Sequence, residues 1–141
     1  MIFLGALGWH VRGLHNPARR QAVRELATAA KASILCLQET KVSSFDPPLA
    51  RETADAIYSS WFSLPADGTR GGIAIFWNPD VVCMTNLTLH HFLISATVTL
   101  LQSGLAGLAF VLSMVYGPAE DALKPEFLQE MKDLTPPPPR P

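Results

Sequence analysis

The stretch Leu35-Cys36-Leu37-Gln38-Glu39-Thr40-Lys41 places a carboxylate two residues after an uninterrupted apolar run. We interpret residues 33–38 as a buried β-strand, with Glu39 just beyond its C-terminal end. Open α/β sheets place their ligands at this end of their strands. A carboxylate in that position can hold a hard divalent cation such as Mg²⁺. The alternative is an ordinary exposed glutamate, because most glutamates lie on protein surfaces.

Upstream of this stretch, the pattern predicts a strand and a helix. Residues 2–9 form a short apolar run that is typical of a strand. Asn16 followed by Pro17 is a helix N-cap signal, and the predicted helix continues to about Lys31. Apolar residues at spacings of three and four give this helix one buried face. Strand, helix and strand in this order indicate a βαβ-like unit.

Downstream, the chain is rich in predicted strands. The expected elements are a weak helix over residues 47–56, strands over 57–65, 71–77 and 81–89, and a last helix over 125–134. Turn signals at Asp67-Gly68 and Asn78-Pro79-Asp80 separate the strands. With the hairpin described next, this makes about seven strands and three helices. The fold class is α/β or α+β with a mixed sheet.

No charged residue occurs between Val81 and Ala119, which raises the question of a membrane span. Residues 94–100 alternate strictly between apolar and polar, which is the period of a strand. We therefore expect a hairpin, with a turn at Gln102-Ser103-Gly104 and a second, more buried strand over 105–116. The N-terminus has no basic region before its apolar residues and does not resemble a signal peptide. We expect an intracellular protein without a membrane segment.

The length and composition limit the classes of protein to which this chain can belong. The 141 residues suffice for one domain with one core, and the formal net charge of −1 gives no global attraction to nucleic acid. The 48% hydrophobic content excludes a disordered chain, and two cysteines are too few for a disulfide framework. Five of the twelve prolines lie in the last six residues. Residues 135–141 are therefore expected to form a polyproline tail outside the core.

Four further groups of residues could carry chemistry. His10 follows the first predicted strand and would lie near Glu39 if the two strands were neighbours; the alternative is a histidine without a partner. Tyr116 ends a predicted strand and could donate to a phosphate, or it could be a tyrosine at the rim of the core. His90 and His91 point to opposite faces of a strand, so we interpret them as hairpin surface. The last group is a cluster of arginines that suits a phosphate backbone or a solvated helix face, namely Arg12, Arg19, Arg20 and Arg24.

Several blocks in series resemble one family. These are Trp9-His10-Val11-Arg12-Gly13-Leu14, Leu35 to Lys41 as quoted above, Gly71-Gly72-Ile73-Ala74-Ile75-Phe76-Trp77 and Val115-Tyr116-Gly117-Pro118. They resemble the endonuclease/exonuclease/phosphatase superfamily, and within it the apurinic-like endonuclease domain of plant LINE retrotransposons. The resemblance implies a four-layer α/β sandwich that hydrolyses phosphodiesters with Mg²⁺ or Mn²⁺. It implies that Glu39 binds the metal, that Tyr116 contacts the scissile phosphate, and that DNA is the partner.

The sequence also departs from the family pattern. His10, the second candidate metal residue beside Glu39, stands where the family has an asparagine that helps order the metal site, and an imidazole nitrogen suits Mg²⁺ poorly. The later Gly-Asp-x-Asn and Ser-Asp-His blocks are absent. We therefore expect residues 1–134 to be a partial domain that ends where the second sheet should begin. Such a domain would be inactive alone, would expose an apolar sheet face to self-association, and would be nuclear if the retroelement role persists. The alternative is a non-catalytic remnant that binds nucleic acid or protein.

Overall fold

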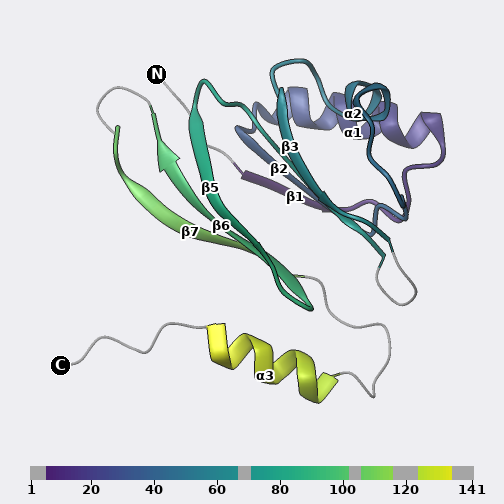
Figure 1. Ribbon diagram of the computed structural model, residues 1–141. Helices are drawn as coiled ribbons and strands as arrows, with labels where there is room; N and C mark the ends of the chain where they lie inside the picture. Colours follow the sequence, from purple (N-terminus) through teal and green to yellow (C-terminus); the bar gives the residue numbers. More distant parts are fainter. Residues whose placement is uncertain (1–5, 67–70, 102–105, 116–123, 135–141) are drawn as a thin grey trace.

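In the computed structural model, two β-sheets are stacked against each other and a pair of helices covers one outer face (Figure 1). The structure describes residues 6–66, 71–101, 106–115 and 124–134. The predicted turns at Asp67-Gly68 and Gln102-Ser103-Gly104 and the tail over 135–141 lie outside these residues. The elements, in chain order, are β1 (Ala6–His10), α1 (Pro17–Ala30), β2 (Ile34–Gln38), α2 (Pro47–Thr53), β3 (Ser60–Leu64), β4 (Ile73–Trp77), β5 (Val82–Leu89), β6 (Leu93–Leu100), β7 (Ala109–Val115) and α3 (Lys124–Leu134).

The first sheet is mixed and has the strand order β1-β2-β4-β3. β1 and β2 are parallel and are joined through α1, which confirms the predicted βαβ unit. β4 runs antiparallel to both β2 and β3. Helix α1 begins where the sequence predicts, because the Asn16 side chain accepts a hydrogen bond from the Ala18 backbone N–H and Pro17 occupies the first turn.

The second sheet has the order β5-β6-β7, and all its pairings are antiparallel. The uncharged stretch therefore contains a strand pair, as the alternation predicts. Among the described residues, no helix has both the length and the apolar character needed to cross a membrane. The prediction of a more buried second strand was wrong: β6 buries every second residue, whereas most of β7 is exposed. A continuous apolar run identifies a strand but does not say whether it lies at the edge of its sheet.

Two cores hold these layers together. One lies between the helices and the first sheet and includes Val23, Leu35, Tyr58 and Phe76. The other lies between the two sheets, where Ile34 and Ile75 meet Ile94 and other residues of the second sheet. The expectation that the first sheet lacks a partner sheet was wrong, because β5, β6 and β7 already form one. Its apolar inner face is covered rather than open to water.

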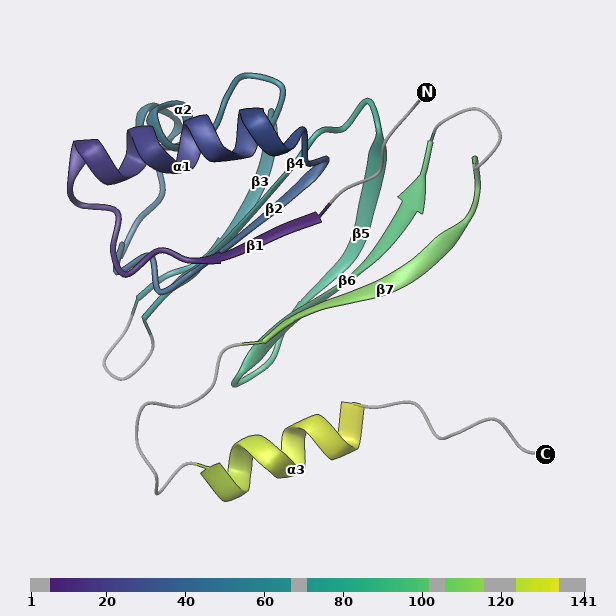
Figure 2. The same cartoon turned by 180° about the vertical axis from the view of Figure 1, so that it is seen from behind.

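Helix α3 contacts the turn between β5 and β6 rather than the middle of a sheet (Figure 2). Phe127 packs edge-on against Phe92 with the ring centroids 5.5 Å apart. The Glu130 carboxylate accepts a hydrogen bond from the Phe92 backbone N–H at 3.0 Å. Within α3, Phe127 and Met131 are partly buried, whereas Leu128 is exposed.

Candidate functional site

The parallel pairing of β1 and β2 brings His10 and Glu39 together. His10 is in register with Gln38, so Glu39 is the first residue beyond the paired ends. One carboxylate oxygen of Glu39 contacts His10 Nε2, and the other lies 3.6 Å from Lys41 Nζ. The Glu39 side chain is 31% exposed, which leaves the carboxylate accessible. The predicted proximity of these two residues is confirmed. The alternative, a histidine without a partner, was wrong.

The backbone around this carboxylate adopts a conformation that side chains rarely allow. Arg12, Glu39 and Lys41 have φ values of 55°, 56° and 57°. Each such non-glycine residue costs about 1–3 kcal/mol and persists only when its surroundings enforce it. Here the two loops enforce it mutually, since Gly13 N–H donates to the Glu39 carbonyl at 2.7 Å and Leu14 N–H donates to the Thr40 carbonyl at 2.9 Å. Strain of this kind is common at functional sites.

Two glycines before β4 make room for the Glu39 loop. Thr40 N–H donates to the Gly72 carbonyl at 3.2 Å, and Lys41 N–H donates to the Gly71 carbonyl at 2.6 Å. A Cβ on Gly71 would lie 3.0 Å from Glu39 Cγ, and a Cβ on Gly72 would lie 2.5 Å from Thr40 Oγ1. Sequence reasoning missed this role, although a glycine pair directly before an apolar strand was the available signal.

The end of β7 reaches the same place from the second sheet. The Gln38 side-chain amide donates a hydrogen bond to the Val115 carbonyl and so connects the end of β2 to the end of β7. Tyr116, which follows Val115, lies outside the described residues. Its predicted contact with a phosphate therefore stays a prediction, and the position of Val115 brings the chain to the candidate site.

The predicted arginine cluster shapes the loop after β1. Arg19 donates to the Val11 and Arg12 carbonyls at 2.7 and 3.1 Å, and Arg20 donates to the Leu14 carbonyl at 2.7 Å. Arg24 reaches from α1 to the Arg51 carbonyl at the end of α2. Arg12 itself is exposed. Arg19 and Arg20 thus hold the loop after β1, on which Arg12 lies, whereas Arg24 holds the backbone of α2.

A divalent cation fits this arrangement in a limited way. Mg²⁺ usually takes one or two protein carboxylates and completes its shell with water and substrate phosphate oxygens. Glu39 offers one such carboxylate at an accessible strand end. Within the described residues, no group of three His, Cys, Asp or Glu side chains could hold a metal. The geometry therefore suits a cation held by Glu39 together with water and phosphate, and it does not provide a closed protein cage.

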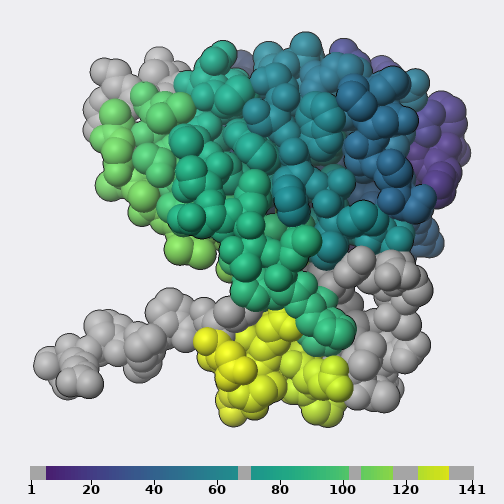
Figure 3. All heavy atoms as spheres, viewed as in Figure 1, coloured from purple at the N-terminus to yellow at the C-terminus, as the bar shows by residue number. Residues whose placement is uncertain are grey.

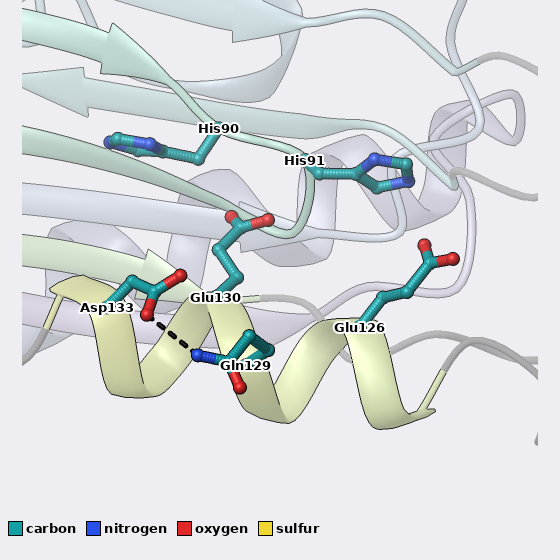
Figure 4. Close-up of a pocket in the computed structure, with 6 residues that line it drawn as sticks. All are labelled: His90, His91, Glu126, Gln129, Glu130 and Asp133. Atoms are coloured by element: carbon teal, nitrogen blue, oxygen red, sulfur yellow. Dashed lines mark hydrogen bonds between the residues drawn. The ribbon is translucent and has the colours of Figure 1, made fainter.

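A separate pocket lies between the β5–β6 turn and α3 (Figure 4). It is lined by His90, His91, Glu126, Gln129, Glu130 and Asp133. The imidazole of His90 hydrogen-bonds the Ser95 hydroxyl at 3.1 Å, and Gln129 donates to Asp133 at 2.8 Å. The two histidines lie at the surface of the hairpin, as predicted. Their side chains extend in different directions. Neither histidine belongs to a group of three His, Cys, Asp or Glu side chains that could hold a metal ion among the described residues.

Comparison with known proteins identifies the family. The chain belongs to the Endonuclease/Exonuclease/phosphatase family, whose sequence pattern matches residues 7–140. No curated protein sequence matches it. Among solved structures, a humanized TDP2 of D. rerio carrying 14 mutations is similar with a TM-score of 0.65 at 16% identity, over 93% of this chain and 54% of that one. The AP endonuclease LMAP from Leishmania major is similar with a TM-score of 0.62 at 19% identity, over 92% of this chain and 46% of that one. The chain thus spans about half the length of these structures and shares their fold.

Proposed function

We propose that this chain is part of a nuclease-type phosphodiesterase domain in which Glu39 binds Mg²⁺ or Mn²⁺ and DNA is the substrate. The observation that carries the proposal is the accessible Glu39 carboxylate at the paired ends of β1 and β2, next to His10 and Lys41. Family membership and two structural neighbours, one of them an AP endonuclease, support the reaction class. We further propose derivation from a plant LINE retroelement, on the sequence blocks quoted above. That role would place the protein in the nucleus.

In this proposal, the residues around Glu39 fix its carboxylate before any ligand binds. His10 and Lys41 contact opposite oxygens, and the left-handed backbone of Glu39 is held by Gly13 and the glycine pair before β4. A divalent cation bound there would neutralise negative charge that develops on a phosphate during hydrolysis. Tyr116 would donate a hydrogen bond from its hydroxyl to the same phosphate. Donors that are already held in place stabilise the negative charge that develops there.

We also propose that this chain does not hydrolyse phosphodiesters by itself. The sequence contains no Gly-Asp pair and no Ser-Asp-His block, which in the family supply the acid–base groups. A positioned acid or base contributes about 10²–10⁴-fold to such a reaction. We therefore expect this chain to bind a cation through Glu39 without hydrolysing phosphodiesters.

Titration calorimetry with MgCl₂ and MnCl₂ tests the cation site. The Glu39→Gln variant keeps the size of the side chain but removes its charge. Loss of a group that only orients a metal ligand lowers metal affinity about 10–100-fold. Loss of the ligand itself should therefore lower cation affinity by at least about this much. Glu25→Gln is the matched control, because Glu25 is an exposed glutamate of α1 that accepts a hydrogen bond from Gln21. Equal affinities in wild type and Glu39→Gln would refute the assignment. If the isolated chain cleaves a nicked or abasic DNA duplex, the proposal that it does not hydrolyse phosphodiesters by itself is refuted.

The alternative is a non-catalytic module that binds nucleic acid. It is favoured by the exposed Arg12, which lies on the loop beside Glu39 and Lys41. DNA binding should then weaken with salt, and removing one phosphate contact by Arg12→Gln should reduce the slope of log affinity against log salt by about 0.9. Lys31→Gln, at the other end of α1, is the control. Binding that is independent of salt, or absent, would rule this function out.

A further inference from the structure

The loop over residues 11–15 connects helix α1 to the Glu39 loop. Its hydrogen-bond donors face the Glu39 loop: Gly13 N–H donates to the Glu39 carbonyl at 2.7 Å, and His15 Nε2 donates to the Lys41 carbonyl at 2.7 Å. This loop and the start of α1 lie at one end of the molecule, where the purple atoms reach the right margin of Figure 3. A displacement of the loop would therefore disturb the backbone on both sides of the Glu39 carboxylate.

The carbonyl groups of the same loop are bound from the other side by two arginines at the start of α1. Arg19 Nη1 donates to the Val11 and Arg12 carbonyls at 2.7 and 3.1 Å. Arg20 Nη1 donates to the Leu14 carbonyl at 2.7 Å and to the next carbonyl at 3.0 Å. Hydrogen bonds from a charged donor are roughly twice as strong as those between neutral groups. The loop is thus held by α1 on one side and is bonded to the Glu39 loop on the other.

Arg19 holds the two peptide groups on either side of Arg12. Arg12 has a φ of 55°, in the left-handed region that side chains rarely adopt. A residue in this conformation persists only when the surrounding structure enforces it. The two bonds from Arg19 enforce it directly, because they fix the carbonyl before Arg12 and its own. Without them, we expect the backbone at Arg12 to relax and the following Gly13 N–H to turn away from the Glu39 carbonyl.

We propose that Arg19 is a positioning residue for Glu39: through the loop over 11–15, it holds the carboxylate in the orientation that binds the cation. This inference rests on the proposed function, because it takes Glu39 as the cation ligand. It replaces the expectation from the sequence that Arg19 contacts a DNA phosphate. Arg20 supports the same loop, but its guanidinium also pairs with Glu52, so Arg19 gives the cleaner test.

Titration calorimetry with MnCl₂ compares wild type with Arg19→Gln. Removal of a positive charge near a cation site should by itself strengthen cation binding. Loss of positioning has the opposite sign, so the Mn²⁺ affinity of Arg19→Gln should fall, by about tenfold if Arg19 acts as groups that orient a metal ligand do. The sign of the change therefore separates positioning from a simple effect of charge.

Arg51→Gln is the matched control. Arg51 donates to the Asp55 and Tyr58 carbonyls at 3.0 and 2.8 Å, so it also holds two carbonyls of one loop. That loop lies at the other end of the first sheet, because Ser60 just after it pairs with the last residue of β4, whereas the glycine pair precedes the first. Arg51→Gln should lower Tm, as Arg19→Gln does, but should leave the Mn²⁺ affinity unchanged. Equal losses of affinity in both variants would indicate a merely structural role and would overturn the proposal.

Amide hydrogen exchange followed by NMR gives a second measurement that needs no cation. In Arg19→Gln, the amides of Gly13 and Leu14 should exchange faster relative to those of β4, since these two N–H groups donate to the Glu39 loop. In Arg51→Gln they should not. If wild type binds no Mn²⁺, the proposed function fails, whereas these amides still decide whether Arg19 holds the Glu39 loop.

Three results would overturn the positioning role of Arg19. The first is unchanged exchange of the Gly13 and Leu14 amides in Arg19→Gln. The second is a wild type that binds Mn²⁺ no more tightly than Arg19→Gln does. The third is DNA binding whose slope of log affinity against log salt falls by about 0.9 in Arg19→Gln while these amides are unchanged, because Arg19 would then be a phosphate contact.

Discussion

Replacing Gly72 by alanine tests how tightly the Glu39 loop is built. Gly72 has a φ of +89°, in the region that side chains rarely adopt. An added Cβ would lie 2.5 Å from Thr40 Oγ1 and 3.2 Å from the Ala66 backbone nitrogen. Thr40 is buried, and its backbone N–H donates to the Gly72 carbonyl. The clash therefore acts directly on the residue that follows Glu39.

Two unfavourable free-energy terms add up in the Gly72→Ala variant. The left-handed conformation costs about 1–2 kcal/mol for a residue with a Cβ. Forcing an extra carbon into a packed site costs about 1–3 kcal/mol more. The sum of about 2–5 kcal/mol is a large part of a typical folding stability of about 5–15 kcal/mol. At about 3 °C per kcal/mol for a domain of this size, Tm should fall by about 6–15 °C.

Two other glycines separate the costs. Gly107 has a φ of +86° with no atom within 4 Å of an added Cβ, so Gly107→Ala carries the conformational cost alone. Gly8 has neither a positive φ nor a close neighbour, so Gly8→Ala should change stability little. Urea unfolding followed by tryptophan fluorescence measures all three. If Gly72→Ala costs no more than Gly107→Ala, the proposed close packing of the Gly72 segment against Thr40 is wrong.

Two further predictions concern buried groups. In the folded protein, iodoacetamide should modify Cys83 and spare Cys36, because Cys83 is exposed whereas burial raises the pKa of Cys36 to about 12, and the thiolate is the reactive form. Peptide mass spectrometry reads this out, and equal labelling would contradict the burial of Cys36. Tyr58→Phe should lower the free energy of unfolding by about 1–3 kcal/mol, because the Tyr58 hydroxyl donates to the Ala32 carbonyl at 2.6 Å in the core. Burial, and then Asp55, raise the pKa of Tyr58, so the folded state holds this proton more tightly than the unfolded chain does. Stability should therefore fall as pH rises above about 10 in wild type and fall less in Tyr58→Phe; equal slopes would refute this linkage.

Much of the fold could be predicted because its signals are local. Asn16 and Pro17 determine the start of α1, and the alternation over 94–100 identifies β6. The parallel neighbourhood of β1 and β2 could be inferred from the βαβ order, and with it the contact between His10 and Glu39. These features depend on spacing along the chain or on one common supersecondary unit.

The remaining features depend on contacts between distant parts of the chain. The apolar residues of β7 look the same in sequence whether the strand is central or at an edge, so its exposure was predicted wrongly. The contribution of Gly71 and Gly72 becomes visible only when the Glu39 loop is placed against them. Whether Tyr116 approaches this site, and whether the arginines also bind phosphate, stay predictions.

The hydrogen bond from Gln38 to the Val115 carbonyl has a consequence for synthesis on the ribosome. Its two residues are 77 positions apart in the chain. At about 5–20 residues per second, the acceptor is made roughly 4–15 s after the donor. The first sheet, with the glycine pair that holds the Glu39 loop, is complete at Trp77 and can form during this interval, but the connection to the second sheet must wait. The candidate site is therefore assembled in two stages during translation, and a pause between β2 and β7 would prolong the first.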